Sequence, residues 1–439
     1  MSAIIDSVGG FLGRNRRKFY WLGGSVGGGY LLLKYAQWKW TEYNTKRELE
    51  QTAKSNVKRR FEQNLQDCTF AVGSLLPTLG ENLFTELNVE LVTAQLQQSR
   101  QAKGETQETP NTATPSPPPA AEESSDSAAA EKQKKTKMTL WQELKVLSFT
   151  RTISSVYLVT LLIVFTHLQL NLLGRFFYLD SVIAFSQVDH EQEIQGTVGG
   201  KKGVSDETER KYLTFSWYVL NVGWKQCVKK VQAAVEEVIG SMSLKEPVTY
   251  DILIDVIGRI REKVEHKDSG SFSASMSAFL LPEEGKEENV LRAGGCSDDG
   301  FVVDPELKEL LNETRDFLES SDFQKVLTSC FDEAFDLLFK QIRPTFFAEG
   351  EYKLPKSVVS EVTDSESATA DSSTIVPEPA GPAPRGKALP LAGVIPVVSR
   401  LVHNVVNGVP NIFLEILSAQ QDLKAFSVVM YTGWEDRAL

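Results

Sequence analysis

Residues that bind metals or form disulfide bonds are scarce in this sequence. Its 439 residues include four histidines and four cysteines, which are Cys68, Cys227, Cys296 and Cys330. No two cysteines form a CxxC pair, and no histidine stands at metal-ligand spacing from a cysteine or another histidine. We therefore expect no metal site and no disulfide framework, but separate thiols in a reducing compartment.

Catalytic and phosphate-binding motifs are also lacking. The sequence has no HExxH, no GxSxG and no Walker lysine. The segment QGTVGGKKG departs from a phosphate loop, because Gln195 replaces the first glycine and Lys202 replaces the serine or threonine. A net charge of −11 argues against general nucleic-acid binding, which needs a basic surface. These absences favour a protein that is not an enzyme and uses no cofactor.

A basic cluster near the N-terminus is followed by an uncharged segment from Phe19 to Leu33. As a helix this segment would be ~22 Å long, against about 30 Å for the hydrocarbon core of a bilayer. Extension to Trp38, with Lys34 snorkelling, brings it to ~20 residues, and aromatic residues lie at both ends. We expect a transmembrane anchor at 19–38 that binds lipid. The basic cluster comprises Arg14, Arg16, Arg17 and Lys18, and the anchor includes Phe19, Trp21, Gly23, Gly24, Gly27, Gly28, Leu31, Leu32 and Leu33.

Other interpretations of this segment are weaker. A cleaved signal peptide needs a small-x-small cleavage site, and none is suitably placed. A phosphate loop needs a preceding strand, whereas basic residues precede these glycines. A soluble N-terminal helix stays open as an alternative. The glycines form overlapping GxxxG pairs, which either allow close approach of another helix or are simply tolerated in lipid.

The rest of the chain shows helical periodicity and no convincing run of alternating strands, so we predict an all-α fold. We expect a short basic segment at 1–18, followed after the anchor by an elongated helical bundle over 39–439. Apolar residues recur every third or fourth position from 41 to 96, and a break is expected near Pro77 and Gly80. Four stretches are low in large apolar residues and are predicted to be disordered insertions. They lie at about 101–136, 189–208, 268–300 and 355–386.

Residues 154–173 are a second membrane candidate because they carry no formal charge. Polar residues gather in the second half of this segment, and the core helix of a large bundle is apolar all round as well. We therefore favour a buried helix in the cytosol, and contact with lipid stays open. His167 is then a core histidine with a hydrogen-bond partner rather than a ligand.

Helix starts are predicted from capping residues. Thr139 and Gln142 fit a capping box, which would place Trp141 in the first turn of a helix. Asp304 fits the N-cap of a helix that begins with proline, and Ser321 or Asp322 fits the N-cap of the next.

Without catalytic chemistry, recognition is the expected function, and an amphipathic helix in a groove is the mode natural to a bundle. Trp141 is the candidate anchor residue, because it follows the longest insertion and a run of lysines. From the pattern alone, a core tryptophan is the simpler interpretation.

Several motifs together resemble the peroxisomal biogenesis factor 3 (peroxin-3) family. They are SLLPTL, LWQELKVLSFTR, LQLNLLGRFFYLD, LLNETRDFLESSDFQKVL and LPLAGVIPVV, with the N-terminal basic run and glycine-rich anchor. The long Pro-rich insertion suggests a fungal type of member. The resemblance implies a protein of the peroxisomal membrane whose bulk faces the cytosol. It also implies that the protein docks peroxin-19, the soluble chaperone and receptor for new peroxisomal membrane proteins. An amphipathic helix of peroxin-19 would then bind a groove on this protein.

The resemblance also implies which residues form that groove: Leu96, Lys137, Leu140, Trp141 and Leu144. Some members place a lysine where this chain has Gly393, so contact there is open, and Lys387 is a possible substitute. The alternative function is a scaffold or tether on the organelle surface for inheritance, motor or degradation adaptors. That function would use the sides of the bundle instead of the groove.

Overall fold

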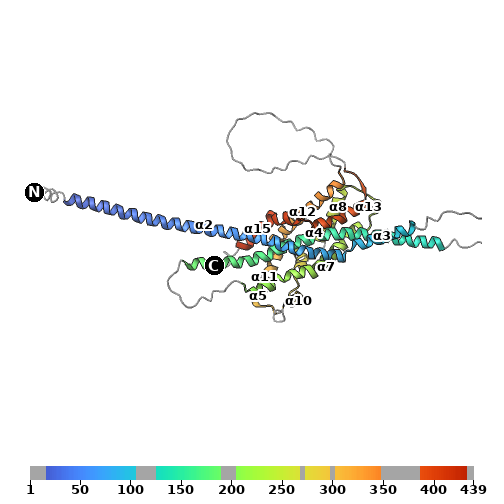
Figure 1. Ribbon diagram of the computed structural model, residues 1–439, viewed down its shortest axis with the longest axis horizontal. Coiled ribbons are helices and arrows are strands. Elements are labelled where there is room, and N and C mark those ends of the chain that lie inside the picture. The colour runs from blue at the N-terminus through green and yellow to red at the C-terminus, as the bar shows by residue number, and fades with distance from the viewer. Residues whose placement is uncertain are drawn as a thin grey trace, which may run out of the picture. The chain divides into compact units, whose positions relative to one another are not determined.

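The computed structural model describes residues 16–104, 125–188, 204–266, 272–296, 302–347 and 386–432 (Figure 1). The chain divides into two compact units, Met1–Gln63 and Asn64–Leu439. The described part of the first unit is helical and belongs to α2 (Arg16–Glu86), which continues into the second unit.

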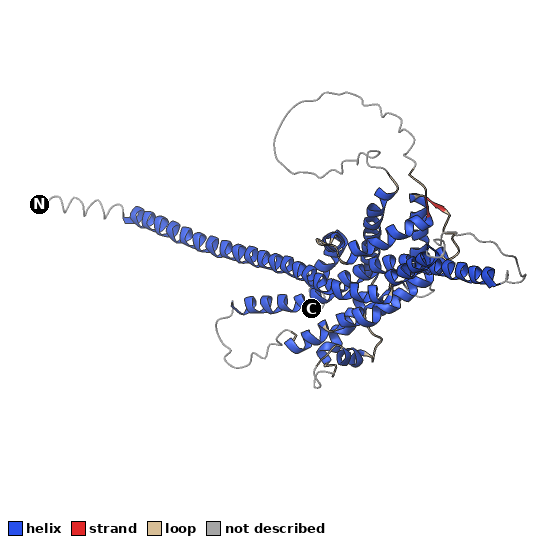
Figure 2. Cartoon of the chain, turned by 45° about the vertical axis from the view of Figure 1, so that its right-hand side comes forward, coloured by secondary structure: helices blue, strands red, loops and turns tan. Residues whose placement is uncertain are grey.

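Helices make up nearly all of the second unit, which confirms the all-α prediction (Figure 2). After α2 come α3 (Val89–Gly104), α4 (Ser125–Val188), α5 (Asp206–Leu213), α6 (Phe215–Tyr218), the π-helix η1 (Val219–Gly223), α7 (Trp224–Ile239), α8 (Tyr250–His266), α9 (Phe272–Leu280), α10 (Glu287–Ala293), α11 (Pro305–Glu319), α12 (Ser321–Ile342), the 3-10 helix η3 (Arg343–Thr345), α13 (Leu391–Val406), α14 (Ile412–Ala419) and α15 (Gln421–Thr432). Two short strands, β1 (Pro247–Val248) and β2 (Leu389–Pro390), pair antiparallel.

Helix α4 is the centre of the second unit. Every residue from Ser148 to Gln169 is buried, and α3, α7, α12, α13 and α15 all pack against this helix. Among the described residues, one helix, Lys137–Phe176, is long and apolar enough to cross a membrane, and 94% of its most apolar window is buried inside the protein. The expectation that residues 154–173 are a buried helix is therefore confirmed.

Some buried polar side chains of α4 bond to the helices around it, while the hydroxyls of Ser148, Thr150, Ser154 and Thr166 have no partner among the described residues. Thr152 donates to the carbonyl of Val398 at 2.8 Å, and Tyr157 donates to Glu265 at 2.8 Å. His167 is also unpartnered, because neither ring nitrogen has a hydrogen-bond partner among the described residues. The prediction of a hydrogen-bonded core histidine was therefore wrong for the imidazole. Its burial, with a smaller contribution from the charge of Lys424, lowers the pKa of His167 to about 4.

Helix α2 passes straight through Pro77, so the predicted break near Pro77 and Gly80 was wrong. A proline inside a helix costs ~3 kcal/mol. Leu76, Leu79 and Leu83 are buried on the opposite face, and each contributes about 1.5–3 kcal/mol. Pro77 is exposed, so water can reach the backbone where the proline removes a hydrogen bond. Side-chain burial therefore outweighs the local penalty, and the helix ends only at Glu86.

The structure describes only parts of the predicted insertions. Backbone helix covers residues 101–104 and 125–136 of the first, and the remainder of it lies outside the described residues. The stretch 268–300 was assigned wrongly, because α9 and α10 lie within it and bury Met276, Phe279 and Leu291. Residues 189–203 and 355–385 lie outside the described residues.

Two predicted helix starts were also wrong. Thr139 and Gln142 lie inside α4, which begins at Ser125, so they are not a capping box. The N-cap of α12 is Ser320, whose hydroxyl accepts from the backbone N–H of Phe323 at 3.1 Å. Asp304 is the N-cap residue of α11, as predicted, but its carboxylate accepts from Lys211 at 2.8 Å instead of capping the helix.

Candidate docking site between α3 and α4

Helices α3 and α4 lie side by side and run antiparallel (Figure 1). An ion pair joins the two helices, in which Nη1 of Arg151 lies 2.9 and 2.8 Å from the two carboxylate oxygens of Glu90. Helical residues rise ~1.5 Å each, so Leu96 and Leu144 lie at nearly the same distance from this pair, ~9 and ~10.5 Å along their helices. Leu96 and Leu144 therefore lie opposite each other, with Trp141 about one turn farther along.

The predicted groove residues differ in burial. Leu96 and Leu144 are 4% and 6% exposed and belong to the core. Leu140 and Trp141 are half-buried and pack against that core, and Lys137 is half-buried as well. Met138, beside them, is 60% exposed. The indole is therefore neither fully enclosed nor fully free, and part of its surface is open to a partner.

A buried lysine supports the helix one turn beyond Trp141. Lys145 donates to the carbonyl oxygens of Gly240 at 3.0 Å and Met242 at 2.8 Å, just after the end of α7. Burial lowers the pKa of Lys145, and the charge of Glu246 acts in the opposite direction. This contact fixes the position of the turn after α7 relative to α4.

The LPLAG motif also comes to this turn. The backbone N–H groups of Leu391 and Ala392 donate to the carbonyls of Glu246 and Leu244, next to the short strands drawn red in Figure 2. Gly393 is exposed, and a Cβ atom there would meet Pro390 only at 3.7 Å. A longer side chain at Gly393 would therefore fit, although a role for Gly393 or Lys387 in the groove stays a prediction.

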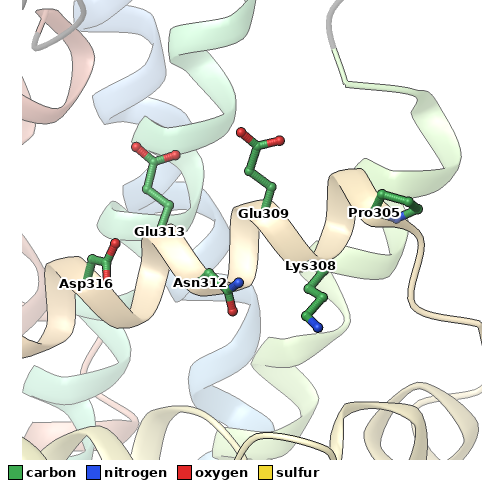
Figure 3. Close-up of a pocket in the computed structure, with 6 residues that line it drawn as sticks. All are labelled: Pro305, Lys308, Glu309, Asn312, Glu313 and Asp316. Atoms are coloured by element: carbon green, nitrogen blue, oxygen red, sulfur yellow. The ribbon is translucent and has the colours of Figure 1, made fainter. Parts of the chain in front are cut away.

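A hollow of about 370 Å³ lies on α11 (Figure 3). Its lining is mostly polar and acidic and comprises Pro305, Lys308, Glu309, Asn312, Glu313 and Asp316. None of the predicted groove residues belongs to this lining. The carboxylate of Glu313 is held by Arg175 through bonds of 2.6 and 2.5 Å. The hollow has no aromatic or aliphatic anchor, so it does not suit the apolar face of an amphipathic helix.

The basic cluster and the anchor lie near the N-terminus, at the start of α2 or before it. Arg14 lies outside the described residues, and the other residues of the basic cluster and anchor lie on α2 with side chains that are not described. Beyond them Tyr35, Trp38, Trp40 and Tyr43 are each 59–70% exposed. The rings of Tyr35 and Trp38 lie 5.9 Å apart on one side of the helix, and at 100° per residue Trp40 and Tyr43 lie on another side. Aromatic side chains of this kind are common where a helix meets a membrane interface.

The chemistry of the described residues is that of a folded core. No three His, Cys, Asp or Glu side chains among them are grouped so as to hold a metal ion. All four cysteines are free thiols, and burial raises the pKa of Cys68, Cys227 and Cys330 to about 12. Such thiols are poor nucleophiles at neutral pH.

The sequence interpretation missed Arg151 and Glu90, which join α3 to α4. The available signal was a single arginine immediately before a long uncharged segment, because a charge in such a place needs a partner. Its partner, 61 residues earlier in the chain, could not be identified from local pattern.

Comparison with known proteins agrees with the motifs. The family model Peroxin-3 matches residues 10–433. Peroxisomal biogenesis factor 3 of Yarrowia lipolytica is 29% identical, covering 97% of this chain and 99% of the relative, and its human counterpart is 28% identical, covering 98% of each. Peroxisomal membrane protein PEX3 of Komagataella phaffii is 31% identical over 60% of each chain. The chain therefore belongs to the peroxin-3 family, and its role is in peroxisome biogenesis.

Proposed function

We propose that this protein is a docking receptor on the peroxisomal membrane for peroxin-19. In this proposal an anchor at 19–38 holds the second unit on the cytosolic side. The N-terminal amphipathic helix of peroxin-19 binds on the surface of α3 and α4 around Trp141, and docking delivers new membrane proteins for insertion.

The half-buried indole of Trp141 is the observation that carries the proposal. It packs against the core on one side, beside the buried Leu96 and Leu144. Aromatic anchors of this kind dominate helix-in-groove binding because they bury a large apolar area at low entropic cost. The exposed Met138 beside it adds a soft, adaptable apolar contact.

Substitution of Trp141 tests the proposal. We expect Trp141→Ala, in the full chain reconstituted in lipid nanodiscs, to weaken binding of a synthetic peptide of that helix by about 2 kcal/mol, or ~30-fold. Calorimetric titration measures the affinity. Because the indole is half-buried, we expect the free energy of unfolding to fall by less than the ~3–5 kcal/mol of a core aromatic.

A matched control is Trp217→Ala. Trp217 is also half-buried and packed against the core, but it lies on α6. This variant should keep the peptide affinity of the wild type. If both variants bind as the wild type does, the groove is not the docking site, and a tether that uses other faces becomes the better explanation.

A further inference from the structure

One buried arginine connects the helices that form the proposed groove. Arg151 is 1% exposed, and besides its pair with Glu90 its Nη2 donates to the hydroxyl of Ser399 at 2.9 Å. Its guanidinium also lies over the ring of Phe84, at 5.4 Å from the ring centre. Arg151 on α4 therefore contacts α2, α3 and α13.

The contacts of Arg151 converge on a joint between two helices. Helix α2 ends at Glu86 and α3 begins at Val89, so only Leu87 and Asn88 separate them. Arg151 approaches the carbonyl of Leu87 at 3.5 Å and pairs with Glu90 in the first turn of α3. A two-residue joint leaves the direction of the next helix free to vary, and a charge-assisted bond to the first turn of that helix restricts it.

The direction of α3 sets the distance of Leu96 from Leu144 and Trp141 on α4. Leu96 lies ~9 Å along α3 from Glu90. A tilt of ~10° at the joint would therefore move Leu96 by ~1.5 Å relative to Leu144 and Trp141, a displacement large enough to impair a fitted binding site.

We propose that Arg151 and Glu90 are a positioning pair for the docking groove, holding α3 at the spacing from α4 that the partner helix requires. This inference rests on the proposed function. The Glu90 side chain is 61% exposed, but Arg151 is buried, so loss of its counter-charge would lower the stability of the fold as well. The contact also ties the first turn of α3 to one place on α4, because both carboxylate oxygens of Glu90 meet a nitrogen of a buried guanidinium.

The test is Glu90→Gln in the full chain in nanodiscs, because the amide keeps the shape and one acceptor but loses the charge and the second bond. Glu86→Gln is the matched control: it removes the same charge four residues earlier, and no ion pair of Glu86 is seen in the described part of the chain. We expect Glu90→Gln to weaken the peptide of peroxin-19 three- to tenfold and Glu86→Gln to change the affinity less than twofold.

Two further measurements separate positioning from general stability. The thermal midpoint of Glu90→Gln should fall below that of Glu86→Gln, because buried Arg151 loses its counter-charge. Hydrogen exchange of the α3 amides from Val92 to Leu96 should become several-fold faster, and that of α12 should not. Arg151→Lys, which keeps the charge and loses the planar fork, should also weaken the peptide.

The outcomes are distinguishable. Peptide affinity unchanged in Glu90→Gln but reduced in Trp141→Ala would overturn the positioning role and leave the docking proposal intact. Unchanged affinity in both variants would overturn the docking proposal and with it this inference. A lowered midpoint with unchanged affinity would assign the pair to folding alone.

Discussion

Lowering the pH should destabilise the second unit through His167, and replacing His167 with leucine should remove that effect. The imidazole is fully buried, and neither ring nitrogen has a hydrogen-bond partner in the described part of the structure. The folded protein therefore holds it neutral, and its pKa falls to about 4, chiefly through burial. In the unfolded chain the imidazole titrates near its ordinary pKa of about 6.5.

The sign and size follow from proton linkage. Because the folded pKa is depressed, the contribution to stability is complete above the unfolded pKa and is lost as the pH falls, since the unfolded state then binds the extra proton. Each pKa unit corresponds to ~1.4 kcal/mol, so the full loss below about pH 4 is ~3 kcal/mol, and the loss between about pH 7 and about pH 5 is ~2 kcal/mol.

Urea unfolding of the full chain in a non-ionic detergent, followed by circular dichroism, measures this loss at several pH values. His167→Leu should be at least as stable as the wild type near pH 7, because an apolar side chain of similar size replaces an unpaired polar one. It should also lose ~2 kcal/mol less than the wild type on going to about pH 5. Parallel pH profiles for the two proteins would refute the reasoning and indicate that water or an unseen partner satisfies the imidazole.

Two further predictions concern a helix start and the rim of the groove. Ser320→Ala should lower the free energy of unfolding by about 1 kcal/mol through loss of the N-cap of α12. Ser321→Ala should change that free energy by less than ~0.5 kcal/mol. Equal effects of the two substitutions in denaturant titrations would contradict the assignment of Ser320 as the N-cap. Gly393→Lys should bind the peptide of peroxin-19 two- to fivefold more tightly than Gly393→Gln, because an exposed charge pair contributes ~0.2–1 kcal/mol. Equal affinities of these two variants in calorimetry would place Gly393 outside the groove.

The type of structure could be predicted from the sequence because helical periodicity reflects burial directly. The positions at which helices begin and end could not, because they depend on contacts that the local sequence does not contain. Pro77 signals a break, yet the buried leucines around it keep α2 continuous. Thr139 and Gln142 match a capping box, yet the chain before them is already helical. In both cases a local signal was outweighed by neighbouring structure.

The candidate site shows the same limit. Trp141 could be selected from its place in the sequence and from family motifs, and it is half-buried as a docking residue should be. Leu96 and Leu144 proved to be core residues, since the pairing of α3 with α4 buries them. Arg151 and Glu90, which join these two helices, come from distant parts of the chain, and no periodicity connects them.

The burial of α4 also has a consequence for the order of synthesis. Thr152 bonds to the carbonyl of Val398, which lies 246 residues later in the chain. At ~5–20 residues per second, the ribosome delivers that partner about 12–50 s after Thr152 has been made. During this interval α3, and later α7 and α12, become available to cover α4, but α13 and α15 are not yet complete. A segment with the length and hydropathy of a membrane span is therefore covered only in part while the chain is being made.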